Sequence, residues 1–328
     1  MKIIEQSSLT QLLGAFFENP QVVDFRLITQ GKENTTIKVD LSDGPIIVRI
    51  WGETHGYMGV HSNADIADEV AFMDFCRRNG APVPRLMPAK DGSLYQKTPD
   101  NCCYAVMEYV DGETPQNFTD DMAAQIAKTM AQMHVRTADF TFPEPRSWPG
   151  SVLDMTNDRI SKYEAGELAV DDDQTITEAI AQYRTLLAAC DLSALPKGVI
   201  HGDIMWENIK FKNGKLHGIF DFGDCRESYF VEDIAKTLLF VFESPEHCVF
   251  GQNGHTVPVF LQNYQAVRQL TKAEEHSLPL FYMSRFLYQV LGYYIKAAKG
   301  KTECLELARS TIARYNQHRA FFMTGIVG

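Results

Sequence analysis

Two short polar clusters constrain this chain more than any other feature of its sequence. The first is His201-Gly202-Asp203, with Asn208 five residues after Asp203, and the second begins at Asp221, thirteen residues after Asn208. Each cluster follows a short apolar segment typical of a strand, so its polar groups stand at a strand end. The oxygens of Asp203, Asn208 and Asp221 can then converge on one cleft. Amide and carboxylate oxygens suit Mg²⁺, and a carboxylate held off the metal can accept a hydroxyl proton. Together these features predict phosphoryl transfer.

The pattern of apolar residues along the chain changes once, near residue 111. Before this point, short stretches rich in β-branched and aromatic residues predict strands, and one internal helix is expected. The expected strands are 22–28, 34–41, 45–51 and 103–110, and the expected helix is 64–79. Beyond residue 111, apolar residues recur mainly at helical spacing. We therefore expect an α+β fold in which residues 1–110 form a small antiparallel-sheet lobe and residues 111–328 form a larger helical lobe.

Two local signals refine this expectation. Leu9, Leu13 and Phe16 lie on one face of an N-terminal helix, for which Ser8 with Gln11 predicts a capping box. Later in the chain, Asn213-Gly214 lies between two short apolar segments, which is a strong hairpin signal.

Composition excludes several classes of protein. The 328 residues include 31 Lys and Arg against 42 Asp and Glu, so the net charge of −11 disfavours nucleic-acid binding. The seven cysteines are an odd number without a C-x-x-C spacing, which is typical of reduced thiols in a cytoplasmic protein. No segment resembles a signal peptide or a membrane span. We expect a small-molecule partner and no nucleic-acid or membrane partner, with the chain a monomer or a homodimer.

The polar clusters also carry a family resemblance. H-x-D-x-x-x-x-N followed by D-F-G resembles the catalytic and metal loops of protein kinases, although Gly202 stands where H-R-D has Arg and no A-P-E follows. With Met130-Ala131-Gln132-Met133-His134 and Ala81-Pro82-Val83-Pro84, the chain looks like the aminoglycoside phosphotransferase and choline kinase family, which includes homoserine-kinase-type members. The resemblance implies a protein-kinase-like two-lobe fold, ATP between the lobes, and phosphorylation of a small-molecule hydroxyl with ATP and Mg²⁺ as cofactors.

The resemblance also implies a role for each residue of the motifs. Asp203 matches the catalytic base, and Asn208 and Asp221 match the Mg²⁺ ligands. His201 and Asp233 match positions that support the catalytic loop.

The nucleotide-binding residues that the resemblance implies lie in the first lobe. The turn containing Gly31 and Lys32 would lie over the phosphates. Arg49 occupies the position of the protein-kinase lysine, and its expected partner is Glu69. Adenine would be held by the carbonyl group of Glu108 and the N–H group of Val110.

Acidic residues near the second cluster indicate an acceptor that carries an amine, and an amino alcohol, a hydroxy amino acid, a choline-like molecule and an aminoglycoside all qualify. Glu227 is our first choice for binding it and Glu232 the second, with Asp224 and Glu243 nearby. An alternative is that these carboxylates only form a solvated face. Alternatives for the function are a protein Ser/Thr kinase of the stress-response type, a nucleotide-binding pseudokinase without turnover, and a metallohydrolase that uses His201, Asp203 and Asp221.

Overall fold

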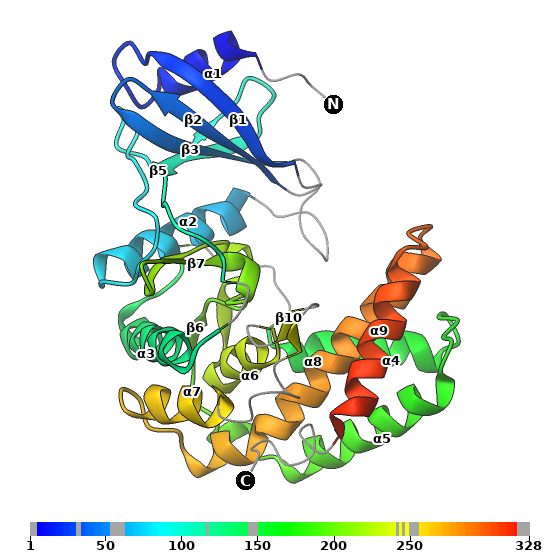
Figure 1. Cartoon of the computed structure of the whole chain (residues 1–328). Coiled ribbons are helices and arrows are strands. Elements are labelled where there is room, and N and C mark those ends of the chain that lie inside the picture. The colour runs from blue at the N-terminus through cyan, green and yellow to red at the C-terminus, as the bar shows by residue number, and fades with distance from the viewer. Residues whose placement is uncertain are drawn as a thin grey trace. The chain divides into compact units, whose positions relative to one another are not determined.

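The computed structural model forms two compact units (Figure 1). It describes residues 5–30, 34–52, 63–115, 118–143, 150–240, 243–244, 247–248 and 256–319. Unit 1 consists of residues 1–113, 140–147 and 208–223, and unit 2 consists of residues 114–139, 148–207 and 224–328. Unit 1 thus takes segments from both sides of residue 111. One reason is that Glu113 and Phe211 pair like strand residues, with N···O distances of 2.9 and 2.8 Å between their backbones.

An antiparallel sheet forms the centre of unit 1, as expected. Its strands are β1 (Val22–Gln30), β2 (Asn34–Leu41), β3 (Gly44–Trp51), β4 (Gln96–Lys97) and β5 (Cys103–Glu108). Their spatial order is β1-β2-β3-β5-β4, and every neighbouring pair is antiparallel. This order places β3 between β2 and β5, so a residue of β3 has a strand on either side.

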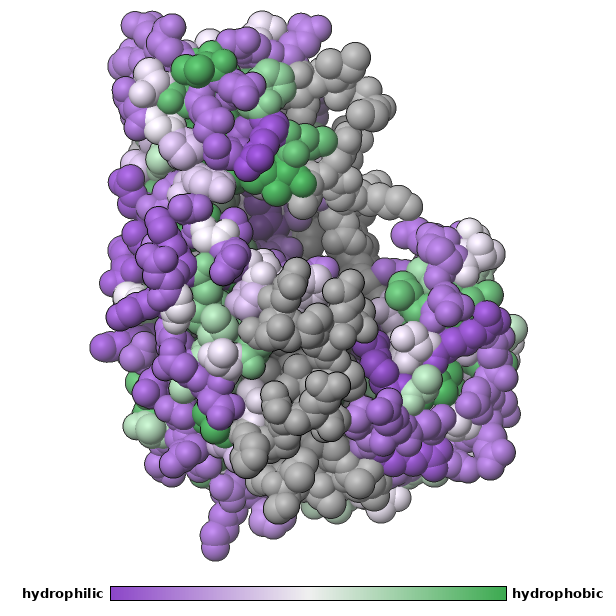
Figure 2. Space-filling model, viewed as in Figure 1, coloured by the Kyte–Doolittle hydropathy of each residue, from purple (hydrophilic) through white to green (hydrophobic). Residues whose placement is uncertain are grey.

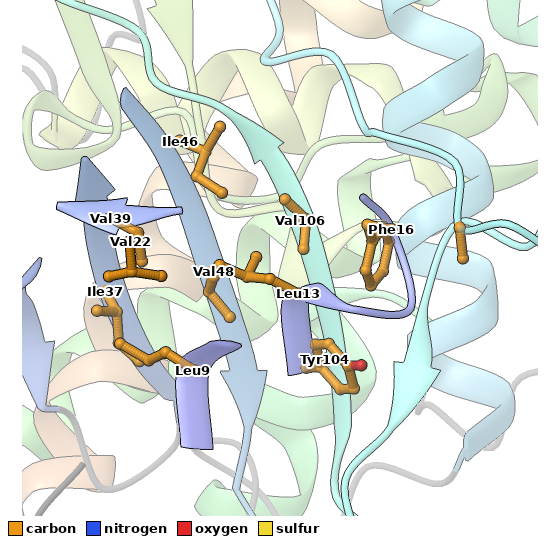
Figure 3. Packing of buried hydrophobic residues seen from close by; sticks show 11 residues of the cluster. Leu9, Leu13, Phe16, Val22, Ile37, Val39, Ile46, Val48, Tyr104 and Val106 are labelled. Atoms are coloured by element: carbon orange, nitrogen blue, oxygen red, sulfur yellow. The ribbon is translucent and has the colours of Figure 1, made fainter. Parts of the chain in front are cut away.

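The N-terminal helix α1 (Gln6–Leu13) packs its apolar face on this sheet (Figure 3). Leu9 and Leu13 are fully buried against a cluster that includes Val48 and Tyr104. Burying each leucine stabilises the fold by about 2 kcal/mol. The predicted capping box is wrong: the helix begins at Gln6 without a side-chain cap, so Ser8 lies inside the first turn.

A helix and a two-stranded hairpin also belong to unit 1. Helix α2 (Asn63–Arg78) ends before Gly80, whose φ of +88° is the left-handed conformation that ends many helices. Strands β7 (Ile209–Lys212) and β8 (Lys215–Ile219) form the hairpin predicted at Asn213-Gly214, where φ is +50° and +73°. Positive φ at both positions is what the tight turn of such a hairpin requires.

Unit 2 is mostly helical, as expected. Its helices are α3 (Asp120–Arg136), α4 (Val152–Glu164), α5 (Asp173–Ala189), α6 (Phe230–Phe240), α7 (Thr256–Gln265), α8 (Lys272–Ala298) and α9 (Cys304–Gln317). The long helix α8 packs against α4, α5, α6 and α9, and α3 packs against α7 (Figure 1). Short paired strands are β6 (Lys197–Ile200) with β9 (Arg226–Tyr229), and β10 (Glu243–Ser244) with β11 (His247–Cys248). Short 3-10 turns lie at 137–139, 192–194, 206–208 and 222–224.

The face seen in Figure 2 is largely hydrophilic, with apolar areas separated from one another. Of the helices that the structure describes, none combines the length and the apolar character that crossing a membrane requires.

Candidate active site

Arg49 links two acidic side chains in unit 1. It lies on β3, and its Nη2 atom is 3.2 Å from a carboxylate oxygen of Glu69 on α2 and 2.9 Å from Oδ1 of Asp221. Burial by itself would lower the pKa of Arg49, but Glu69 and Asp221 raise it above its ordinary value, so the guanidinium stays charged. Glu69 also accepts a hydrogen bond of 3.0 Å from Nε1 of Trp51. The structure thus brings together the pair expected from the sequence and adds Asp221 to it.

Asn208 and Asp221 stand at the open end of the β7–β8 hairpin. Ile209 pairs with Ile219, and beyond this pair the N–H group of Phe220 donates to the carbonyl group of Asn208 at 2.8 Å. Asp221 follows with a φ of +60°, a conformation uncommon for a residue with a side chain. An amide oxygen and a carboxylate presented by one hairpin end are hard donors that fit Mg²⁺.

Aromatic packing fixes α2 beside the residues that follow Asp221. Phe222 is buried, and its ring centroid lies 5.8 Å from that of Phe72 in an edge-on arrangement. Phe72 lies three residues after Glu69, on the same helix. Because this contact holds α2 and the loop together, it supports the alignment of Glu69, Arg49 and Asp221.

The expected adenine-binding segment begins at Glu108, the last residue of β5, and extends to Val110. The Glu108 carboxylate lies 3.3 Å from the guanidinium of Arg77. The backbone N–H group of Glu108 donates to the carbonyl group of Arg85 at 2.9 Å. The carbonyl oxygen of Val110 accepts a 3.3 Å hydrogen bond from Lys210 of β7. Adenine binding by Glu108 and Val110 stays a prediction. Gly31 and Lys32 lie outside the described residues.

In unit 2, the loop that carries Asp203 is held by Asp233 of α6. The two carboxylate oxygens of Asp233 accept the N–H groups of His201 at 3.1 Å and Gly202 at 2.9 Å. Asp233 also bonds Nε2 of His134 at 3.1 Å, and the N–H group of Asp203 donates to Nδ1 of buried His201 at 3.1 Å. Burial alone would raise the pKa of Asp233, but His134, His201 and the Gly202 N–H group lower it below its ordinary value. Both His201 and Asp233 therefore contact the loop from inside the protein.

Lys236, also on α6, contacts Asp203 directly. Its buried ammonium bonds the Asp203 carboxylate and the carbonyl group of Gly202, and lies 3.1 Å from Oδ2 of Asp224. Burial alone would raise the pKa of Asp224, but Lys236, Arg226 and Arg285 lower it. Lys236 was not among the residues predicted from the sequence. The available signal was the single basic residue of the segment Phe230–Phe240, followed by the apolar run Leu238-Leu239-Phe240, because a buried ammonium needs an acidic partner.

Gly202 is required by the close packing of this loop. Its φ is +77°, and a Cβ atom there would overlap the carbonyl oxygen of Asp224 and lie 2.7 Å from Nη1 of Arg226. No side chain fits this position without movement of the backbone. This packing gives a physical reason for His-Gly-Asp in place of His-Arg-Asp.

The two acidic residues expected to bind the acceptor have different environments. Glu232 on α6 is 3% exposed, and its carboxylate bonds Arg226, the Ser228 hydroxyl and, at 3.1 Å, the N–H group of Val152. These partners give Glu232 an internal role in unit 2. Glu227 lies on β9 opposite Val199, and it is exposed. Glu227 is thus the more accessible of the two candidates.

Within the described part of the chain, no group of three or more His, Cys, Asp and Glu side chains is arranged to hold a metal ion. His201 is buried and bonded to the Asp203 backbone. This environment gives no support to the metallohydrolase alternative.

Comparison with known proteins gives a consistent picture. Residues 24–275 match the phosphotransferase enzyme family, APH. The chain is 24% identical over 320 residues to a homoserine kinase of Mesorhizobium japonicum, with 94% of this chain and 93% of the relative covered. It is 25% identical over 281 residues to a homoserine kinase of Azorhizobium caulinodans, with 84% and 81% covered.

Solved structures share the fold. An amicoumacin kinase, in complex with AMP-PNP, Ca²⁺ and Ami, superposes with a TM-score of 0.70 at 18% identity, with 95% of this chain and 94% of that chain covered. A microcompartment-associated aminopropanol kinase superposes with a TM-score of 0.67 at 18% identity, with 97% and 98% covered. These matches confirm the expected kinase-like fold.

Proposed function

Because the chain belongs to the phosphotransferase enzyme family, APH, we propose that it transfers the γ-phosphoryl group of ATP, with Mg²⁺, to the hydroxyl group of a small amino alcohol or hydroxy amino acid. Membership of this family makes the chain a small-molecule kinase with an alcohol group as acceptor.

The observation that carries the proposal is the fixed carboxylate of Asp203. It lies on a loop whose backbone donates to buried Asp233, and it bonds Lys236. An ordinary turn needs neither a buried carboxylate beneath its N–H groups nor a buried ammonium on its side chain. A carboxylate held in this way is suited to orient an acceptor hydroxyl and to accept its proton as the O–P bond forms.

The proposed nucleotide-handling residues belong to unit 1. We assign the Mg²⁺ ligands to Asn208 and Asp221, at the open end of one hairpin. A bound Mg²⁺ would offset the negative charge that develops on the phosphates during transfer. Arg49 is assigned to the phosphates, because a guanidinium can contact phosphate and carboxylate oxygens at once. Its contacts with Glu69 and Asp221 hold it in place for this role.

The acceptor class follows from the relatives together with the charge of the chain. Homoserine and aminopropanol each carry a hydroxyl and an amine, and they give their names to the kinases that this chain resembles. The net charge of −11 favours the approach of a cationic group. Asp224 and Glu232 are compensated by internal cations, so exposed Glu227 is the carboxylate that we assign to the amine.

A screen of acceptors tests this proposal. The purified chain is incubated with Mg·ATP and with homoserine, 1-amino-2-propanol, choline, an aminoglycoside, uncharged sugars or a mixed peptide substrate, and phosphorylated products are identified by mass. We expect product only with amine-bearing alcohols. Phosphorylation of sugars alone would overturn the proposed acceptor class. Phosphorylation of peptides would favour the protein-kinase alternative. The absence of product with every acceptor would favour the pseudokinase alternative.

Glu227→Gln tests the residue assigned to the amine. Since the amide lacks the charge of the carboxylate, we expect the KM for the amine acceptor to rise and the KM for ATP to stay nearly unchanged. The matched control is Glu306→Gln, an exposed change on α9. Unchanged acceptor KM in the Glu227 variant would show that another group binds the amine.

A further inference from the structure

The buried ammonium of Lys236 is surrounded by three oxygen-bearing groups. Its side chain is 4% exposed and meets the Asp203 carboxylate, the Gly202 carbonyl group and, at 3.1 Å, Oδ2 of Asp224. A lysine ammonium has three N–H donors and no acceptor, so this set of partners matches its capacity. The ammonium is thus oriented by its surroundings, and it in turn orients the groups that it bonds.

Lys236 and Asp233 act on the same loop from one face of α6. They are three residues apart, which places them on neighbouring positions of the helix surface. Asp233 accepts the N–H groups of His201 and Gly202, whereas Lys236 donates to the carbonyl group of Gly202 and to the side chain of Asp203. Asp233 therefore fixes the backbone of the loop, and Lys236 fixes the carboxylate that the loop carries.

The neighbouring buried ion pair does not contact this carboxylate in the same way. Arg226 of β9 bonds Glu232 and donates to the backbone carbonyl of Asp224 at 2.7 Å. These contacts join β9 to α6 and to the end of the second cluster. Lys236, by contrast, bonds the side chain that we assign as the proton acceptor.

We propose that Lys236 is a positioning residue for phosphoryl transfer, which aims the Asp203 carboxylate at the acceptor hydroxyl. The inference rests on the proposed function. In the step concerned, the acceptor oxygen forms a bond to the γ-phosphorus, the bond from that phosphorus to the β–γ bridging oxygen breaks, and ADP leaves. The hydroxyl proton moves to Asp203, and Lys236 takes no part in this proton transfer.

The test compares Lys236→Met with Lys162→Met in steady-state assays with the acceptor found in the screen. Lys162 pairs with Asp158 on the surface of α4, so its loss should leave kcat unchanged. For Lys236→Met we expect kcat to fall by about 10²-fold, the effect of moving a reacting group by about 1 Å, with the KM for ATP nearly unchanged. Wild-type kcat in this variant would overturn the proposal.

A double variant separates positioning from a general structural role. If Lys236 acts through Asp203, then Lys236→Met should slow the Asp203→Asn enzyme little or not at all, because the carboxylate to be positioned is already gone. A purely structural role predicts instead that the two losses multiply. Multiplied losses would overturn the proposal.

Removing one buried charge can prevent folding, so a charge-balanced variant provides a second test. Lys236→Gln with Asp224→Asn removes one positive and one negative charge together and keeps hydrogen-bonding groups at both positions. We expect this variant to fold and still to show a kcat about 10²-fold lower, while wild-type kcat would overturn the proposal. An inactive wild-type chain would instead refute the proposed function, which distinguishes the two failures.

Discussion

Gly202→Ala is the change whose effect the structure predicts most directly. Alanine at a φ of +77° costs about 1–2 kcal/mol relative to glycine. Its Cβ atom would also overlap the carbonyl oxygen of Asp224 and lie 2.7 Å from Nη1 of Arg226. The contact with Asp224 is with a backbone atom, so relieving it requires movement of a loop. Overpacking of this kind costs about 1–3 kcal/mol more. The expected loss of unfolding free energy is therefore about 2–5 kcal/mol.

Gly214→Ala is the matched control. Gly214 has a φ of +73°, but a Cβ atom there would meet nothing within 4 Å. This variant should lose only the conformational part, about 1–2 kcal/mol. It lies at the tip of the β7–β8 hairpin, away from the hairpin end that presents Asn208 and Asp221, so kcat should be retained.

Urea unfolding of the two variants, together with kcat, provides the assay. We expect Gly202→Ala to be the less stable variant by about 1–3 kcal/mol and to lose kcat, because the shifted loop carries Asp203. Equal losses of stability in the two variants would refute the argument from packing. Full kcat in Gly202→Ala would refute the link between this packing and the base.

Two further predictions concern the metal and pH. Asp221→Ala should weaken Mg·ATP binding by removing a charged ligand, and calorimetric titration showing unchanged affinity and metal dependence would contradict the assignment. Burial lowers the pKa of His134 below 6.5, although Asp233 opposes this shift. As pH falls through 6.5, the unfolded chain therefore binds a proton at this histidine that the folded chain does not bind. The free energy of unfolding then falls by at most about 1.4 kcal/mol per pH unit. In urea unfolding at several pH values, His134→Gln should show a shallower loss between about pH 7 and about pH 5.5, and an unchanged slope would contradict this account.

Local features of the fold could be predicted from the sequence, because they depend on neighbouring residues. Asn213-Gly214 predicts a hairpin because Asn and Gly tolerate the positive φ that the turn requires. Gly80 predicts the end of α2 because glycine tolerates the positive φ at which many helices end. The capping box at Ser8 was wrong because such a signal does not fix where the first turn begins.

The long-range part of the candidate site could not be predicted in this way. Lys236 meets Asp203 from 33 positions away, and only tertiary packing decides that contact. Sequence position likewise does not separate Glu227 from Glu232. The alternation of β9 exposes the former, whereas α6 is buried around the latter, where Arg226 compensates its charge.

The central claim is that Asp203 accepts the proton of an acceptor hydroxyl during phosphoryl transfer, and Asp203→Asn tests it most directly. Transfer to the amine-bearing acceptor and Mg·ATP affinity are measured for this variant and for Asp158→Asn, a surface control on α4. We expect Asp203→Asn to lower kcat by about 10²–10⁴-fold with Mg·ATP affinity largely intact, and Asp158→Asn to behave as the wild type. Turnover by Asp203→Asn at the wild-type rate would contradict the account.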